Sequence, residues 1–507
     1  MKNIIKLSLL GLLLTFAFTS CNDFLDEKPY SDLTDENLGI GDNNTDSVKY
    51  STAEQAEQLI SALYKTFGNE YWQLDTYILN DAQSDNSYSG EDNPNRYQID
   101  EFRVETTNQN ATRDWKYLYE AIAQTNAILT WVPQISDPAL TEARKKEILG
   151  EASFIRALNY FNLVRIYNRV PLITKDIPEV SNENLEEVYP LLYPPQVGKD
   201  TIYTQIIEDL DFALKNVADY SSFKFKITKA IVNLTFADVY ATKDGQAGAD
   251  WTKVKQYAEA VVNDKRYDLL ENYDDIFAVD ASSTGNTLPV GNLKHEHSKE
   301  SIFEVDYNPS PLMGNWAASM FYGIDWKKFN TPSKDLVRAF NLANDDTRLN
   351  ASIKFSDVTG KWTDKYWPSN NFPYCYKLRA RESANIVIYR LPEAILLLAD
   401  AENELGNISA AQYQLNKIRK RVSLADTPAN TKEALRLAIE NEHRLEFAFE
   451  GKRWFDLLRR GRAIEVMKSC TDHQKEFAKR LSEYYIIWPI PQSEMDLNIN
   501  LKQNPGY

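Results

Sequence analysis

The feature that most constrains the fold is a helical period of apolar residues. In segment 146–169, apolar side chains recur mostly every three or four residues, and too many positions are apolar for a helix with one side in solvent. Pro171 ends the segment, because proline cannot continue a helix. The pattern predicts a long, largely buried helix, and it indicates a mainly α-helical fold if the rest of the chain behaves alike.

The same period recurs in two further arrays of segments. Consecutive helices joined by short turns favour helical hairpins, similar to degenerate tetratricopeptide units with a repeat of roughly 34 residues, or else an irregular helical bundle. Small residues at Ala237, Ala241, Ala399 and Ala401 would let neighbouring helices pack closely. The predicted helices are 202–217, 228–242 with Thr228 as N-cap, 251–263, 388–405 with Gly406 as C-cap, 409–422 and 432–449.

Two stretches between the helices are predicted to be loop-rich. Residues 69–110 are dense in Asn, Asp, Ser and Tyr, and residues 279–367 mix turns and aromatic residues with a strand-like run at 301–307. Long insertions on rigid helices commonly carry binding sites. Since no Gly/Ser-rich or Pro-rich linker divides the chain, we expect one domain, 21–507. We divide it into an N-terminal part of about 22–270, an insertion of about 271–385 and a C-terminal helical part of about 386–507.

The first twenty residues have the composition of a secretory signal peptide. Lys2 and Lys6 precede an apolar run that is too short to span a bilayer. The run leads into Cys21 and resembles the lipobox of bacterial lipoproteins, in which the cysteine thiol accepts a lipid. We therefore expect lipidation at Cys21, with a plain secretory signal as the alternative. Acidic residues directly after it resemble a surface-export signal.

The charge balance excludes one class of partner. Removing residues 1–20, which carry two lysines and no acidic residue, changes the net charge from −16 to −18. A chain this acidic lacks the basic surface that non-specific nucleic-acid binding needs. No later apolar run approaches the roughly 20 residues of a membrane-spanning helix. Cys375 and Cys470 remain, either as a disulfide pair or as free thiols.

The sequence offers little catalytic or metal chemistry. It has no nucleophile elbow, phosphate loop or dinucleotide fingerprint. The pair of histidines at 295–297 suggests adventitious metal binding at most, and His443 is interpreted as a solvated or ion-paired residue. One acidic loop could hold calcium, but its spacing is not that of an EF-hand, and we predict a solvated loop and no cofactor. The residues of that loop are Asp81, Asp85, Asn86, Glu91 and Asp92.

Several motifs resemble the SusD/RagB family of outer membrane lipoproteins. They are G-E-A-S-F-I-R-A at 150–157, A-E-N-E-L-G at 401–406, E-F-A-F-E-G-K-R-W-F-D-L at 446–457 and I-W-P-I-P at 487–491. With the lipobox, the resemblance extends from end to end of the chain. One departure, Leu391-Pro392-Glu393 in place of Tyr-Ala-Asp, puts the start of one helix in doubt.

The resemblance implies a SusD-like α-helical fold and a function in nutrient uptake. It implies a lipid-anchored, surface-exposed protein of the outer membrane, not an enzyme, that captures glycans and delivers them to a SusC-like TonB-dependent barrel. A peptide-binding or purely gating subunit of such a transporter is the alternative, and a polysaccharide-degrading enzyme is a third possibility. The charged motif residues are expected to form buried ion pairs and packing, not a ligand site. These residues are Arg156, Glu446, Glu450, Arg453, Trp454 and Asp456.

The resemblance also implies where the ligand lies. Aromatic residues make up 12% of the chain, and a sugar ring packs its C–H face on an aromatic ring while polar side chains pair with its hydroxyls. In the family, the ligand-binding aromatics come from the loops after the first helix and from the middle insertion. The aromatic candidates are Tyr71, Trp72, Tyr88, Tyr97, Trp316, Tyr322 and Trp326, and the polar candidates are Asn80, Asp81 and Arg96.

Overall fold

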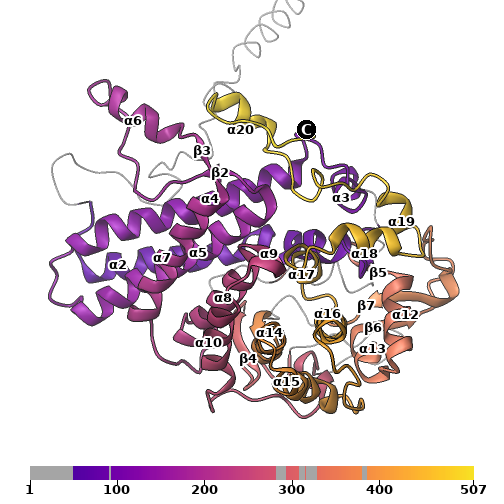
Figure 1. The fold of residues 1–507 in the computed structure, drawn as a ribbon. Coiled ribbons are helices and arrows are strands. Elements are labelled where there is room, and N and C mark those ends of the chain that lie inside the picture. The colour runs from indigo at the N-terminus through magenta and orange to yellow at the C-terminus, as the bar shows by residue number, and fades with distance from the viewer. Residues whose placement is uncertain (1–48, 91–92, 281–292, 308–314, 316–327, 380–384) are drawn as a thin grey trace, which may run out of the picture.

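The computed structural model describes residues 49–90, 93–280, 293–307, 315, 328–379 and 385–507 (Figure 1). The fold is mainly α-helical, as the periodicity predicted, with four two-stranded antiparallel sheets among the described residues. Helices α2 (Ala53–Lys65), α4 (Gln109–Trp131), α5 (Glu142–Tyr167) and α7 (Lys199–Asn216) form the N-terminal layer, in which α5 packs against α4 and α7.

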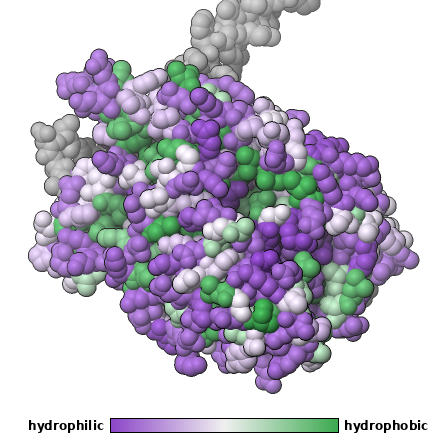
Figure 2. Space-filling model, viewed as in Figure 1, coloured by the Kyte–Doolittle hydropathy of each residue, from purple (hydrophilic) through white to green (hydrophobic). Residues whose placement is uncertain are grey.

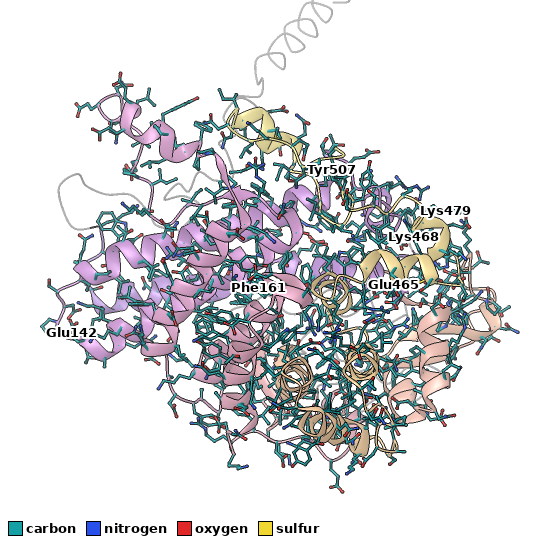
Figure 3. The ribbon with its side chains drawn as sticks, in the orientation of Figure 1. Glu142, Phe161, Glu465, Lys468, Lys479 and Tyr507 are labelled. Atoms are coloured by element: carbon teal, nitrogen blue, oxygen red, sulfur yellow. The ribbon has the colours of Figure 1, made fainter. Side chains whose placement is uncertain are left out.

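Helix α5 is the long buried helix that the apolar period predicted. It begins after Thr141, whose hydroxyl caps it by accepting a hydrogen bond from Arg144 N at 3.2 Å. Glu142 at its start is exposed, whereas Phe161 near its end is fully buried inside the molecule (Figure 3). The N-terminal turn therefore meets solvent, and the rest of α5 anchors the core.

The two arrays of predicted helices are confirmed, and one helix joins them. Helix α10 (Trp251–Val262) packs against both α8 (Lys229–Thr242) and α14 (Leu391–Glu404), which also contact each other. The four predicted alanines are fully buried there, so the helix backbones approach closely. Helices α15 (Ile408–Arg421) and α16 (Lys432–Glu446) complete the second array. Gly406 ends α14 with φ +85°, a conformation that favours glycine.

The predicted start of the second array was wrong by three residues. Residues 388–390 belong to strand β8 (Ile386–Arg390), which pairs with β4 (Ser301–Val305), and α14 begins only at Leu391. Pro392 lies in the first turn of α14, where the missing N–H of proline leaves no hydrogen bond unmade. The departure from the family motif is thus compatible with a helix start.

The stretch predicted as a loop after the first helix is largely ordered and buried. It contains two π-helical turns, η2 (Tyr71–Asp75) and η3 (Ile78–Ala82), then β1 (Ser87–Tyr88) and α3 (Pro94–Asp100). Strand β1 pairs with β5 (Thr331–Pro332) of the middle insertion. The two stretches from which the ligand site was expected therefore meet in space.

The middle insertion and the C-terminal segment hold the other elements. Trp488 N donates to Ile166 O at 2.8 Å, which ties the C-terminal segment to the end of α5. The insertion contains α12 (Lys334–Ala343), α13 (Asp346–Ser352), β6 (Ile353–Ser356) and β7 (Phe372–Cys375). The remaining elements are η1 (Thr66–Gly68), η4 (Val132–Gln134), β2 (Val170–Pro171), α6 (Leu185–Leu192), β3 (Gln196–Val197), α9 (Gly245–Gly248), η5 (Tyr273–Ile276), η6 (Ser369–Asn371), α17 (Arg453–Arg459), α18 (Ala463–Ser469), α19 (Gln474–Phe477) and α20 (Gln492–Leu497).

The visible surface is mostly hydrophilic, with apolar residues scattered over it (Figure 2). Within the described ranges, every helix is too short or too polar to cross a bilayer. Cys375 and Cys470 are both buried and both free, so the structure contains no bond between them.

Candidate functional site

The charged motif residues form a buried ionic network, as predicted. Glu446 pairs with three arginines: Arg348 at 3.1 Å, Arg390 at 2.5 Å, and Arg421. Glu450 pairs with Arg390 at 2.8 Å. Burial alone would raise the pKa of Glu446, but the three arginines hold it well below its ordinary value. The network therefore fixes the packing of α16 against β8 and α13.

A second set of buried pairs surrounds the start of α17. Arg453 pairs with Asp85 at 2.8 Å, and Asp456 pairs with Arg460 at 2.9 Å. Trp454, which lies between Arg453 and Asp456 in the sequence, is buried. Arg156 of α5 pairs with Asp209 of α7 at 2.6 Å. The prediction that the charged motif residues form buried or half-buried ion pairs is confirmed.

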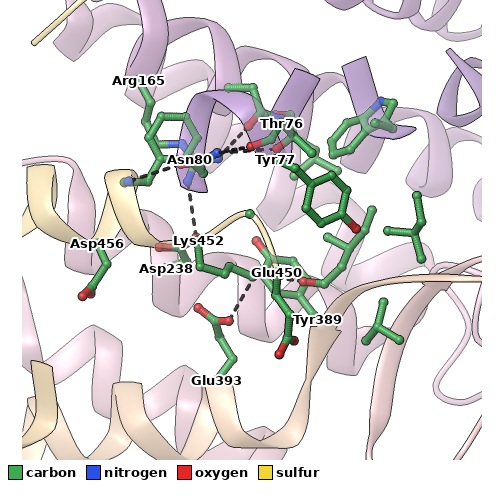
Figure 4. A pocket seen from close by; sticks show the side chains of 18 of the residues that line it. Thr76, Tyr77, Asn80, Arg165, Asp238, Tyr389, Glu393, Glu450, Lys452 and Asp456 are labelled. Carbon is green, nitrogen blue, oxygen red and sulfur yellow. Dashed lines mark hydrogen bonds and ion pairs between the residues drawn. The ribbon is translucent and has the colours of Figure 1, made fainter. Parts of the chain in front are cut away.

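A pocket lies where η2, η3, α5, β8, α14 and α17 meet (Figure 4). It encloses about 750 Å³ of empty space, including the part open to solvent. Trp72 and Asn80, two of the predicted site residues, line it. Asn80 spans two elements, since its amide donates to Thr76 O at 3.1 Å and its Oδ1 accepts from Phe455 N at 3.2 Å.

The charged side chains of this pocket are paired with one another. Lys452 Nζ lies 3.1 Å from Glu393 and donates to Ile388 O at 2.8 Å. His443 lies between two carboxylates, with Glu393 and Asp456 each 3.6 Å away. His443 is buried, so the interpretation of it as a solvated residue is wrong, and its two carboxylate neighbours fit the ion-paired interpretation.

Two carboxyl groups of the pocket, those of Glu393 and Glu450, have lowered pKa values, the direction opposite to that of a catalytic acid. Burial would raise the pKa of Glu393, but Lys452 and His443 lower it to about 2. Burial would also raise the pKa of Glu450, but Arg390 and Lys377 outweigh burial and lower it. A glycosidase needs one carboxyl group with a raised pKa as general acid. These carboxylates stay ionised and hold cations in place.

Most of the predicted ligand residues in the first stretch are buried, which corrects the picture of an exposed platform there. Tyr71 and Tyr88 are 0% and 1% exposed, so neither ring offers a face to a sugar. Trp72 is buried and packs against Tyr71, with 5.1 Å between the ring centroids. The physical reason is that η2 packs against α4, and β1 against η3 and β5, which covers these rings.

The other candidates have mixed positions. Asp81 is buried and accepts hydrogen bonds from Gly451 N at 3.1 Å and from Asn330 at 3.3 Å. Arg96 is buried over the ring of Phe329, and Tyr97 is half-buried. Trp316, Tyr322 and Trp326 lie outside the described residues.

The acidic loop is not solvated, contrary to the prediction. Asp81, Asp85 and Asn86 are buried, and Asp85 is neutralised by Arg453 and by Arg444 at 3.1 Å. Glu91 and Asp92 fall outside the described ranges. In the described part of the chain, no three His, Cys, Asp or Glu side chains are grouped so that they could hold a metal ion. His297, of the pair at 295–297, faces Asp306 at 3.4 Å.

A surface of three half-buried aromatic residues lies where the first stretch meets the insertion. We call it the aromatic surface: Trp362, Tyr366 and Trp367, on the turn between β6 and β7. Asp364 positions it, because one carboxylate oxygen accepts from Tyr366 N at 2.8 Å and Trp367 N at 3.0 Å. The same oxygen accepts from the hydroxyl of Tyr88 at 2.7 Å. Buried Tyr88 thus supports the aromatic surface from below.

Each ring of the aromatic surface is fixed by its own contact. The indole N–H of Trp367 donates to Pro332 O at 2.9 Å. Tyr366 stacks on His473, with 3.5 Å between centroids and 6° between planes, and Trp362 packs edge-on against Phe372 at 4.4 Å. Sequence reasoning did not single out this segment. The available signal was three aromatics within six residues of a polar turn, K-W-T-D-K-Y-W at 361–367.

Comparisons with known proteins agree with the fold. A family model described as "SusD family" matches residues 316–507, and one described as "Starch-binding associating with outer membrane" matches residues 23–241. SusD-like protein P25 of Formosa agariphila is 24% identical over 97% of this chain and 98% of its own length. A SusD superfamily structure from Bacteroides thetaiotaomicron has a TM-score of 0.74 at 24% identity, covering 90% of this chain and 100% of its own. A "Laminarin binding SusD-like protein" has a TM-score of 0.71 at 22% identity, with the same coverage.

The two family models match both ends of the chain, and the helical architecture agrees with solved members over nine-tenths of it. The chain belongs to the SusD/RagB family.

Proposed function

We propose that this chain is a glycan-capturing lipoprotein of the cell surface that passes its ligand to a TonB-dependent barrel. The observation that carries the proposal is the aromatic surface, whose rings are held in place by Asp364, Pro332 and His473. Fixed rings lose little conformational entropy when a sugar stacks on them.

The energies suit capture followed by release. A stacked ring contributes about 0.5–1.5 kcal/mol, so a few rings with some hydrogen bonds give about micromolar to millimolar affinity. Such affinity concentrates a polysaccharide at the surface and still lets it leave for a transporter. A matching family model is described as starch-binding, and one solved relative as laminarin-binding, which supports a glycan as cargo.

The membrane attachment and the barrel partner rest on the sequence and the family. Cys21 at the end of the signal-like segment is the proposed lipid-bearing residue, and the family description includes association with the outer membrane. A SusC-like barrel is the proposed recipient of the glycan. The laminarin-binding relative supports a binding role without hydrolysis.

The test is native affinity electrophoresis of the chain from residue 22 onward, through gels that contain a panel of polysaccharides, with released reducing ends assayed in parallel. We expect one glycan to retard the protein without new reducing ends. Release of reducing ends would establish an enzyme instead. Retardation by no glycan would overturn glycan capture and favour the peptide-binding or gating alternative.

A further inference from the structure

We infer that the aromatic surface selects acidic glycans, whose sugar rings carry carboxylate or sulfate groups. This inference rests on the glycan-capturing function proposed above and names the chemical class of the ligand.

Every ring of the aromatic surface has an ammonium group beside it. Lys328 Nζ lies 4.7 Å from the ring centroid of Trp362, Lys365 Nζ lies 5.1 Å from that of Tyr366, and Lys334 Nζ lies 5.6 Å from that of Trp367. These distances are within the range of a cation–π attraction. Each of the three rings therefore has one lysine close to it.

Two of these lysines are available to a ligand. Lys334 and Lys365 are exposed, and Lys361, next to Trp362, is exposed as well. Lys328 is buried and pairs with Asp364 at 3.4 Å, so it serves to hold the turn. The exposed cations therefore lie at the rim and the neutralised pair lies beneath.

The nearby acidic groups do not cancel this charge. The carboxylate of Asp364 is neutralised by Lys328 and accepts three hydrogen bonds. Asp335 pairs with Arg338 at 2.6 Å. Asp357 is exposed on the same segment, and half-buried Asp472 lies beside His473. Buried Asp100 and half-buried Glu101 lie near Tyr366, and Glu101 pairs with Arg103 at 2.6 Å. The three exposed lysines outnumber the one fully exposed acid among these groups, Asp357, on a chain whose net charge is −16. A polyanion repelled by most of the protein would be drawn to this surface.

The geometry matches a charged sugar better than a neutral one. A pyranose stacked on one of these rings brings its substituents within reach of the lysine beside that ring. A carboxylate or sulfate there forms a charge-assisted hydrogen bond with lysine. A neutral glucan offers the lysines no such partner.

The test measures binding by calorimetry for three matched sugars: oligogalacturonate, a sulfated carrageenan oligosaccharide and a neutral laminarin oligosaccharide. Poly-L-glutamate serves as a polyanion without sugar rings. The variants are Lys334→Gln and Lys365→Gln, singly and together. The control is Lys417→Gln, because Lys417 lies 4.6 Å from the ring of exposed Tyr413 on α15, a similar pair elsewhere on the molecule.

We expect an acidic sugar to bind most tightly, each lysine variant to weaken it about 1.5- to 5-fold, and Lys417→Gln to leave it unchanged. Raising NaCl from about 0.05 to about 0.5 M should weaken it further. Tighter binding of the neutral sugar, equal binding of poly-L-glutamate, or indifference to the lysine variants would overturn the acidic class and leave glycan capture standing. Binding of no sugar would overturn both.

Discussion

At the scale of single residues, charge is concentrated inside the protein as well as on its surface. Glu446 is fully buried with three arginines around it, and Glu393 is buried between Lys452 and His443. Removing one member of such a group leaves an uncompensated charge in a poorly solvated place. These residues therefore make sharp tests of the structural interpretation.

The first prediction concerns Glu446→Gln. The substitution leaves Arg348, Arg390 and Arg421 without a shared anion, so we expect the free energy of unfolding to fall by about 3–5 kcal/mol near neutral pH. Because folding lowers the pKa of Glu446, its contribution is present above the ordinary value of 4.5 and shrinks as the pH falls below it.

Urea titration at several pH values measures this difference. Glu465→Gln is the control, since Glu465 is exposed (Figure 3) and pairs with half-buried Arg462 at 3.0 Å, so that its charge stays in solvent. Equal effects of the two substitutions would show that the buried network does not stabilise the fold.

The second prediction concerns Asp81→Asn and has the opposite sign. Burial raises the pKa of Asp81 to about 7, even though it accepts hydrogen bonds from Gly451 and Asn330. Because folding raises the pKa of Asp81 from 3.8 to about 7, this residue lowers the stability of the fold progressively between about pH 4 and pH 7. The full loss of stability remains above pH 7. We expect Asp81→Asn to stabilise the protein by about 1–4 kcal/mol at pH 8 and by little at pH 4, measured by urea titration. A loss of stability at pH 8 would contradict this account.

The sequence motifs predicted the buried ion pairs, but nothing in the sequence predicted that several ligand-binding candidates are buried. Tyr71, Trp72 and Tyr88 stand in a stretch rich in Asn, Asp and Ser, which has the composition of a solvent-exposed loop. Their burial depends on partners far away in sequence, such as Thr331, which pairs with Tyr88. No local pattern encodes that pairing.

At the scale of elements, the helices with a sustained apolar period could be predicted, and the irregular ones could not. Helices α5, α7, α10 and α15 begin and end within a few residues of the prediction. The π-helical turns η2 and η3 are too short to display a period. The first residues of the predicted helix at 388 form strand β8, because β4 lies beside them.

The third prediction concerns the turn that carries the aromatic surface. Asp364→Ala removes the acceptor for Tyr366 N, Trp367 N and the Tyr88 hydroxyl, so the turn should lose its conformation. We expect glycan binding to weaken about tenfold or more while the helical circular dichroism signal stays unchanged. Asp364→Asn, which keeps one acceptor oxygen, should retain more binding than Asp364→Ala. Equal binding by Asp364→Ala and the unaltered protein would show that the conformation of this turn does not matter for glycan binding.

At the scale of the whole molecule, the order of the motifs along the chain was the strongest signal. They predicted the family and the helical architecture together. They could not predict the aromatic surface, because its residues lie on an insertion outside the motifs. The fold supplies a rigid helical body, and the junction of two distant segments supplies the rings.

The fourth prediction concerns the proposed lipid anchor. Cys21→Ser removes the thiol that would carry the lipid. In cells fed a labelled fatty acid, we expect the unaltered protein to incorporate the label and the variant to lose it. Cys470→Ser is the matched control, since Cys470 is buried and free. Label that persists in Cys21→Ser would refute lipidation at this residue.

The most direct test of the central claim is the affinity of the double variant Trp362→Ala/Tyr366→Ala for the glycan that electrophoresis identifies, measured by calorimetry beside Tyr413→Ala as the control. If the aromatic surface captures the glycan, losing two stacked rings should weaken binding about 5- to 150-fold, while Tyr413→Ala binds as before. Unchanged affinity in the folded double variant would contradict the account and place the glycan elsewhere on the protein.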